Sequence, residues 1–177
     1  MIGPHGGFDG VDVVSRNSRK RWMRAALLVS NPTGLRLDRW LVGATGFSFV
    51  NQFYARAGGF EPRPCLLLTT RHHKTGAPRT VVLPYLRDED RFLIVGSHGG
   101  RPTDAIWAKN LRIHTDCQLR VDRRDIPAVA QEPIGDERDR VWSIVTRDGA
   151  YLGYQKMAAP RVIPVFVLAR RALAVAD

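Results

Sequence analysis

The amino-terminal third of the chain reads as a glycine-rich lead-in followed by helical patterns. Residues 1–18 contain glycines and polar residues without a long apolar run, so we expect them to be disordered. Apolar and basic positions at helical spacing predict a helix over residues 19–29, and a longer apolar stretch predicts a second helix over residues 35–57. We therefore treat residues 19–58 as an amino-terminal helical segment.

Short runs rich in β-branched and aromatic residues follow, and turn-forming residues separate them. Each run predicts a strand. The Lys-Thr-Gly-Ala-Pro sequence at residues 74–78 is typical of a hairpin turn, and an acidic turn at residues 88–90 closes a second hairpin. The predicted strands are residues 65–70, 80–86, 92–95, 117–121, 126–132 and 162–168.

Helical and loop patterns interrupt these strands in the second half of the chain. We expect a short helix around Trp107, an amphipathic helix over residues 136–145, and a loop with glycine and tyrosine over residues 148–155. Strands without regular βαβ alternation argue against a Rossmann domain. The pattern therefore predicts a mainly β, α+β domain with peripheral helices.

Length and cysteine content narrow this prediction. A chain of 177 residues is long enough for one domain with its own hydrophobic core. Residues 1–10 lack the apolar core of a signal peptide, so we do not expect secretion. Cys65 and Cys117 fall on predicted strands and are expected to be small, buried, reduced thiols, which favours a cytoplasmic location.

The formal net charge of +10 indicates an anionic ligand or surface as partner. No helix-turn-helix, zinc finger or RNA-binding aromatic motif accompanies the charge, so nucleic acid is not expected. Basic residues at positions 19–24 precede an uncharged stretch, residues 40–53, which is too short to span a bilayer. Two interpretations of that stretch stay open: packing in the core, or lying on an anionic membrane surface at the inner face of the cell membrane.

The turn Ser-His-Gly-Gly at residues 97–100 is a candidate for binding chemistry. Paired glycines admit backbone angles that other residues avoid, and such turns free N–H groups to bind an anion. Lys74 and Arg79 bracket the first hairpin turn and can add charge-assisted contacts to a phosphate. Taken alone, a solvated turn lysine and a strand arginine would explain these two residues equally well.

Short motifs along the second half of the chain follow one order. They are Thr69-Thr70, Lys74-Thr75-Gly76, Pro78-Arg79, Leu83-Pro84-Tyr85-Leu86, Asp88-Glu89-Asp90, Ser97-His98-Gly99-Gly100, Trp107-Ala108-Lys109-Asn110-Leu111, Tyr151-x-x-Tyr154-Gln155 and Val162-Ile163-Pro164-Val165. In this order they resemble the deazaflavin-dependent nitroreductase family, whose members use coenzyme F-420. The resemblance covers about residues 60–170. It implies a six-stranded split β-barrel of the flavin-reductase-like kind over residues 59–171.

The resemblance also implies which residues bind the cofactor. Lys74 and Arg79 would bind its phosphate and acidic tail, and Ser97 would donate to carbonyls of its ring. Trp107 is consistent both with core packing and with a wall of the cofactor site, and Asn110 could cap the helix or orient Trp107. The implied cofactor-binding residues are His73, Lys74, Thr75, Arg79, Ser97, His98, Gly99, Gly100, Trp107 and Asn110.

Tyr151, Tyr154 and Ser97 are the candidate catalytic residues under this resemblance. A phenol can stack on a ring system or donate a hydrogen bond to a reducible carbonyl, whereas packing at the rim of the barrel is the alternative for the tyrosines. The resemblance implies an oxidoreductase that transfers a hydride from reduced F-420 to a small electron-poor acceptor such as a quinone, enone or nitro compound. No acid–base dyad is required, because the cofactor carries the reactive carbon.

Three histidines depart from the family pattern: His72 replaces a glycine, His73 an arginine and His98 a common lysine. Histidine is mostly neutral near neutral pH, so each exchange weakens the positive charge near the expected phosphate. An FMN-dependent split-barrel oxidoreductase and a non-catalytic split-barrel protein that binds an apolar ligand are therefore the alternatives. Adjacent His72 and His73 should face opposite sides of a strand, without a partner at ligand spacing, so no metal site is expected. No motif specifies an oligomeric state.

Overall fold

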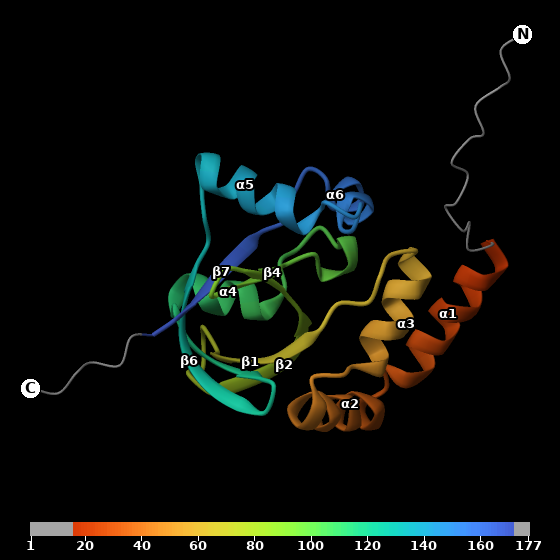
Figure 1. Cartoon of the computed structure of the whole chain (residues 1–177), viewed down its shortest axis with the longest axis horizontal. Coiled ribbons are helices and arrows are strands. Elements are labelled where there is room, and N and C mark those ends of the chain that lie inside the picture. Colours follow the sequence, from red (N-terminus) through yellow and green to blue (C-terminus); the bar gives the residue numbers. More distant parts are fainter. Residues whose placement is uncertain (1–15, 172–177) are drawn as a thin grey trace, which may run out of the picture.

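A curled antiparallel sheet with helices around it forms the fold in the computed structural model, which describes residues 16–171 (Figure 1). The strands are β1 Cys65–Arg71, β2 Pro78–Pro84, β3 Leu86–Asp88, β4 Arg91–Val95, β5 Asp116–Val121, β6 Arg124–Gln131 and β7 Val165–Arg170. They pair in the order β2-β1-β5-β6-β7-β4-β3. The helices are α1 Arg16–Val29, α2 Pro32–Thr45, α3 Phe49–Gly58, the 3₁₀ turn η1 His98–Gly100, α4 Ile106–Ile113, α5 Gly135–Val145 and α6 Leu152–Ala158. The predicted mainly β, split-barrel-like fold with peripheral helices is confirmed.

The predicted strand over residues 80–86 is divided at Tyr85, so the described sheet has seven strands rather than six. The Tyr85 N–H donates to the Pro64 carbonyl at 3.0 Å, outside the strand ladder. Its ring is buried and packs edge-on against Phe92, with ring centroids 5.5 Å apart. Because burial of this ring turns the chain through a corner, β2 and β3 become the two opposite edges of the sheet.

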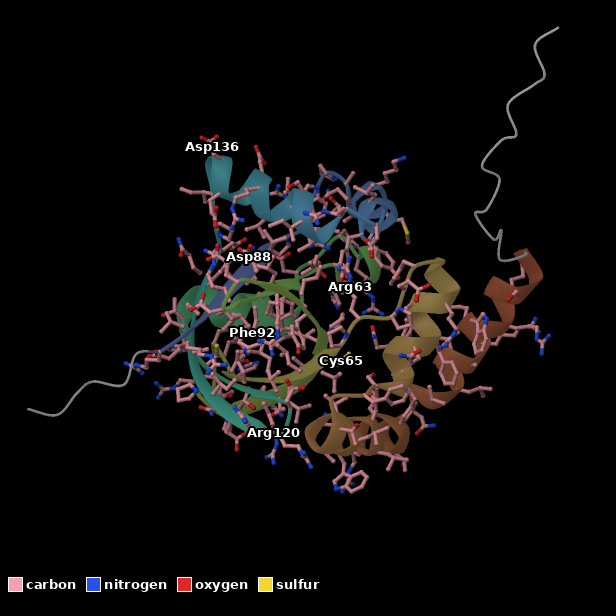
Figure 2. All side chains as sticks on the ribbon, viewed as in Figure 1. Arg63, Cys65, Asp88, Phe92, Arg120 and Asp136 are labelled. Atoms are coloured by element: carbon pink, nitrogen blue, oxygen red, sulfur yellow. The ribbon has the colours of Figure 1, made fainter. Side chains whose placement is uncertain are left out.

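Alternation along the central strands builds two hydrophobic clusters. In β4, Phe92 and Ile94 pack inside the curl of the sheet, whereas Leu93 and Val95 pack on its outer face. Figure 2 shows Phe92 enclosed by the curved strands. Successive side chains of a strand point to opposite faces, so one apolar run serves both layers. Helix α4 closes the inner cluster and helix α5 covers the outer one.

The prediction of one helix over residues 35–57 is wrong, because the chain breaks between α2 and α3. Gly46 ends α2 in the left-handed region (φ 74°), and the Ser48 hydroxyl caps α3 by accepting from the Asn51 N–H at 2.9 Å. Asp38, buried on α2, accepts from the Ser48 hydroxyl at 2.9 Å. A glycine C-cap followed by a serine N-cap separates two helices efficiently.

The predicted loop over residues 148–155 is wrong at its end, because α6 begins at Leu152. Residues 16–18 lie in α1 rather than in a disordered lead-in, and the expectation for residues 1–15 lies outside the described residues. The last strand begins at Val165, three residues later than predicted. Within residues 16–171, no helix is both long and apolar enough to cross a membrane.

The two cysteines are free thiols, as predicted from the sequence. Cys65 is buried and Cys117 is half-buried. Burial raises the pKa of each thiol to about 12. Because the thiolate is the reactive form, both are inert structural residues near neutral pH.

Candidate functional site

A cavity of about 710 Å³ lies where the amino-terminal helices face edge strand β2 and the η1 turn. Residues of α2 and α3 line one side, and residues 80–82 together with Pro84 line another. The backbone of an edge strand has unpaired groups on its outer side, so β2 brings hydrogen-bonding capacity to this cavity. The predicted site residues that line it are Ser97, His98, Gly99, Tyr151 and Tyr154.

The η1 turn has the backbone geometry of an anion-binding nest. Ser97 lies in the right-handed helical region (φ −61°, ψ −34°), and His98 and Gly99 lie in the left-handed region at φ 49° and 63°. A right-handed residue followed by a left-handed one turns successive N–H groups toward one point. Within the described residues, the N–H groups of Ser97, His98 and Gly99 have no hydrogen-bond acceptor. The turn therefore presents three free donors beside the cavity.

The side chains of His98 and Ser97 differ in their hydrogen bonding. The His98 Nδ1 lies 2.8 Å from the Thr103 carbonyl oxygen, and because a carbonyl only accepts, the proton is on Nδ1. The Ser97 hydroxyl makes no capping bond and has no acceptor or donor among the described residues. Ser97 can therefore add a fourth donor to the three backbone N–H groups.

Tyr151 is held in a conformation that tyrosine rarely adopts. It lies in the left-handed region (φ 66°) and is 8% exposed. The Arg63 guanidinium lies over its ring, 5.2 Å from the centroid. Arg63 is fixed in turn by Asp148, at 2.8 Å and 2.9 Å from the two carboxylate oxygens, and by the Val145 carbonyl at 2.9 Å. A bulky residue in this region marks a constrained position and is typical of functional sites.

Both site tyrosines are protonated near neutral pH. Burial raises the pKa of Tyr151 and of Tyr154 above the ordinary value for a phenol. Their rings are tilted against each other with centroids 6.4 Å apart. Each phenol is therefore a hydrogen-bond donor at the edge of the cavity.

Asn110 is completely buried, and its amide groups are used within the protein. Its Oδ1 accepts from the His73 N–H at 2.9 Å and lies 2.8 Å from His73 Nδ1, and its Nδ2 donates to the Thr70 hydroxyl at 2.9 Å. Trp107 is 7% exposed and packs edge-on against Phe166, with centroids 5.6 Å apart. The structure therefore places Asn110 and His73 behind the β1–β2 turn, and Trp107 in the core.

The remaining predicted cofactor residues lie outside the lining of the cavity. Lys74 and Arg79 are exposed on the β1–β2 hairpin, and neither has a side-chain partner among the described residues. The Thr75 hydroxyl lies 3.2 Å from His72 Nδ1, which fixes the hairpin turn. Gly100 is buried against α6 rather than facing the cavity. Among the described residues, Lys74 and Arg79 are therefore two exposed cations without an ion-pair partner.

The sequence reasoning did not identify the cavity residues that come from the helices. Asp38, Ser48, Asn51 and Tyr54 line the cavity from α2, α3 and the link between them. The Asn51 amide also donates to the Arg63 carbonyl at 2.8 Å, which ties α3 to the segment before β1. One signal could have identified this group, because Asp38 is the only acidic residue between positions 19 and 58.

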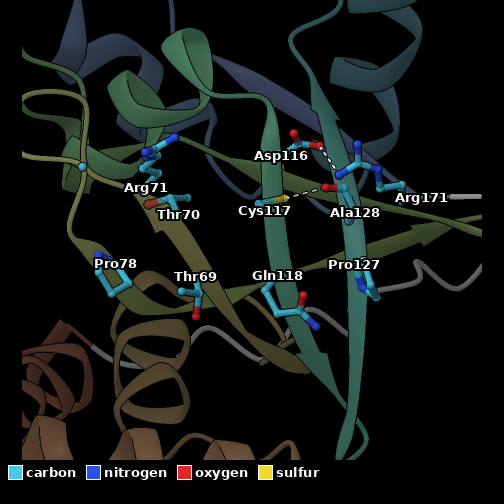
Figure 3. A pocket seen from close by; sticks show the side chains of 11 residues that line it. Thr69, Thr70, Arg71, Pro78, Asp116, Cys117, Gln118, Pro127, Ala128 and Arg171 are labelled. Carbon is cyan, nitrogen blue, oxygen red and sulfur yellow. Dashed lines mark hydrogen bonds and ion pairs between the residues drawn. The ribbon is translucent and has the colours of Figure 1, made fainter. Parts of the chain in front are cut away.

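A second cavity, of about 410 Å³, lies over β1, β5 and β6 (Figure 3). Arg171 and Asp116 form an ion pair at 3.1 Å at its border, and the Cys117 thiol donates to the Ala128 carbonyl at 3.6 Å. None of the predicted site residues lines this cavity. In the described part of the chain, no group of three or more His, Cys, Asp or Glu residues could hold a metal ion.

Comparison with known proteins gives the site its family context. The family model described as F420H(2)-dependent quinone reductase matches residues 47–170. The chain is 41% identical over 148 residues to an F420H(2)-dependent quinone reductase of Mycobacterium tuberculosis, covering 76% of this chain and 99% of that relative. The matched region contains the η1 turn and both site tyrosines.

Two solved structures are similar in fold. A structure described as an F420-H2 dependent reductase, FDR-A, aligns with a TM-score of 0.54 and 30% identity, covering 60% of this chain and 94% of that one. A chain described as a domain-swapped dimer aligns with a TM-score of 0.56 and 25% identity, covering 84% of this chain and 98% of that one. The first of these alignments supports a split-barrel-like assignment for the sheet.

Proposed function

Because the chain belongs to the F420H(2)-dependent quinone reductase family, we propose that it transfers a hydride from reduced coenzyme F-420 to a quinone in the cavity between η1 and α3. The observation that carries this assignment is the convergence of three free N–H groups and two protonated phenols on one cavity. Enone and nitro acceptors, which are also electron-poor, belong to the same proposal as alternative substrates.

The residues present fit an anionic, ring-bearing coenzyme. The N–H groups of residues 97–99 and the Ser97 hydroxyl can donate to oxygen atoms, and the unpaired Lys74 and Arg79 can bind a phosphate or carboxylate outside the cavity. The volume of about 710 Å³ falls in the range usual for small-molecule sites. When bound, the reduced deazaflavin supplies the hydride.

The chain contributes orientation and hydrogen-bond donors. Tyr151 and Tyr154 can donate to a quinone carbonyl oxygen, where negative charge develops as the hydride is transferred. Burial raises the pKa of each phenol, so each stays protonated near neutral pH and can donate a hydrogen bond to that oxygen. Asn110 and His73 are proposed to hold the hairpin that carries Lys74, rather than to contact the coenzyme.

Titration with coenzyme F-420 and with FMN, followed by fluorescence, tests the assignment. We expect saturable binding of F-420 and much weaker binding of FMN, because the nest and the two hairpin cations suit a long acidic tail. Reduced F-420 mixed with a quinone should then be oxidised in the presence of the protein. Preferential FMN binding would favour the FMN-dependent alternative, and binding of neither would favour a non-catalytic protein.

Replacing Tyr154 by phenylalanine should lower quinone turnover by about tenfold, with little change in F-420 affinity. The substitution removes one donor and keeps the ring packing, so only the developing charge on the acceptor loses a partner. Steady-state kinetics and a fluorescence titration measure the two effects. Tyr54→Phe is a suitable control, because Tyr54 also lines the cavity but lies on α3. Lost F-420 binding in Y154F would assign this tyrosine to the coenzyme instead.

We further propose that the enzyme acts in the cytoplasm, at the inner face of the membrane that holds its acceptor. The free thiols support a reducing compartment. Helices α1 and α2 expose large apolar side chains, among which Leu28 is 75% and Trp40 is 68% exposed. Arg36 and Arg39 flank Trp40 at the border of a hollow of about 430 Å³. Aromatic and basic side chains together suit the headgroup layer of an anionic bilayer.

Replacing Trp40 by serine should therefore weaken co-sedimentation with anionic vesicles. Electrostatic attraction should contribute about 1 kcal/mol of binding free energy per basic residue near the headgroups, and added salt should weaken it. Apolar insertion should leave a part of the binding that salt does not remove. Ile134→Ser is the control, because Ile134 is 85% exposed at the start of α5. If wild type, W40S and I134S sediment alike with anionic and neutral vesicles, α2 has another role.

A further inference from the structure

Arg161 donates from three nitrogens to backbone carbonyls that flank the η1 turn. Its Nη2 donates to the Ser97 carbonyl at 2.9 Å, and its Nη1 donates to the Gly96 carbonyl at 3.2 Å. Its Nε donates to the Arg101 carbonyl at 3.0 Å. One guanidinium therefore holds carbonyl groups on both sides of the turn.

These bonds account for the direction of the free N–H groups. The carbonyls of Gly96 and Ser97 accept from Arg161, which is not among the residues that line the cavity beside residues 97–99. In a trans peptide unit the C=O of one residue and the N–H of the next point to opposite sides, so holding the Gly96 and Ser97 carbonyls orients the N–H groups of Ser97 and His98 away from Arg161. His98, which is not glycine, is thereby kept in the left-handed region that the nest requires.

An ion pair with Asp104, which does not line the cavity, balances the charge of Arg161. Its Nη1 also donates to Asp104 Oδ1 at 2.8 Å, and the side chain is 12% exposed. Asp104 also pairs with Arg112, which in turn is bound to Glu132 at 2.6 Å. Arg161 is not among the residues that line the cavity. Arg161 therefore contacts the turn and not the cavity.

We propose that Arg161 is the positioning residue of the anion site, which it keeps open by holding the carbonyl side of the η1 turn. The inference rests on the proposed function, since the anion in question belongs to the coenzyme. Lysine cannot replace arginine here, because its single nitrogen cannot reach carbonyls that three separate guanidinium nitrogens now reach.

The test compares Arg161→Lys with Arg138→Lys. Arg138, on α5, donates to the Ile163 carbonyl at 3.3 Å and is 24% exposed, so it holds the same segment without touching the turn. Misplaced donors should weaken F-420 binding about 10- to 100-fold in R161K. The KM for quinone should stay within about twofold, because the tyrosines are unaltered. R138K should bind F-420 like the wild type.

Two further measurements separate positioning from general stability. Urea unfolding gives the stability of each variant, and guanidinium ion added in the millimolar range to Arg161→Ala should restore part of the F-420 affinity, whereas methylammonium should not. Equal F-420 affinity in R161K and wild type would overturn the inference, as would equal losses in R161K and R138K. If R161K does not fold, Arg161→Gln provides the same comparison. Failure of the wild type to bind F-420 would instead contradict the proposed function.

Discussion

Replacing Gly100 by alanine is expected to destabilise the protein by about 2–5 kcal/mol and to weaken F-420 binding by about tenfold or more. Gly100 lies at φ 76°, and a Cβ atom placed there would meet Met157 Cβ at 2.8 Å. That contact is too short to exist, and Met157 Cβ is fixed to the backbone of α6. Either α6 or the turn must therefore move, and a movement of the turn displaces the nest.

Gly99→Ala is the matched control for this prediction. Gly99 also lies in the left-handed region, at φ 63°, but a Cβ atom there would meet nothing within 4 Å. Its alanine variant should lose only about 1–2 kcal/mol, the cost of the backbone angle alone. Urea unfolding and a fluorescence titration of F-420 measure both variants. Equal losses of stability in the two variants would mean that α6 moves to make room for the new methyl group. The cost of the backbone angle alone would then explain both losses.

Replacing Arg63 by methionine should lower the free energy of unfolding by about 2–4 kcal/mol and reduce quinone turnover. The Arg63 side chain is 10% exposed, and it carries bonds to Asp148 and to the Val145 carbonyl. The variant leaves that carboxylate and that carbonyl without their partner, and it removes the cation above Tyr151. The loop before α6 should loosen, and the strained tyrosine should lose its position.

The control for Arg63 is Arg171→Met, at an ion pair of similar length but open to water. Arg171 and Asp116 lie 3.1 Å apart and are 61% and 64% exposed. Exposed pairs contribute about 1 kcal/mol or less, so this variant should remain close to the wild type in stability. Thermal or urea unfolding compares the two. A loss in R63M no larger than in R171M would show that Asp148 is screened by water and that Tyr151 is held by packing alone.

Local patterns in the sequence were sufficient for most elements of the fold. The run at residues 65–70 and the turn at 74–78 predicted the β1–β2 hairpin, because turn residues and β-branched residues act over a few positions. The helix break after Gly46 was missed, since the apolar stretch continues through it. The corner at Tyr85 was also missed, because it depends on burial of the ring against a later strand.

The candidate site was predicted in part, for a comparable reason. Glycines at 99 and 100 indicated free backbone donors, and the structure provides a nest at residues 97–99. Asn110 was expected near the cofactor, but burial and its bonds to His73 and Thr70 direct its amide inward. A sequence motif can indicate that such a residue belongs to the site. It does not specify whether the side chain points to a ligand or into the protein.

By itself, the sequence determined most of the strands, the glycine turn at residues 97–100 and the resemblance to deazaflavin-dependent enzymes. These depend on neighbouring residues and on motif order, which act locally. Only the tertiary structure decided that α2 and α3 form one wall of the cavity, that Arg63 lies over Tyr151, and that Arg161 donates to the Ser97 carbonyl of the turn. The last contact joins residues 64 positions apart in the chain. Such contacts follow from how the sheet curls and the helices pack on it, and no local pattern encodes them.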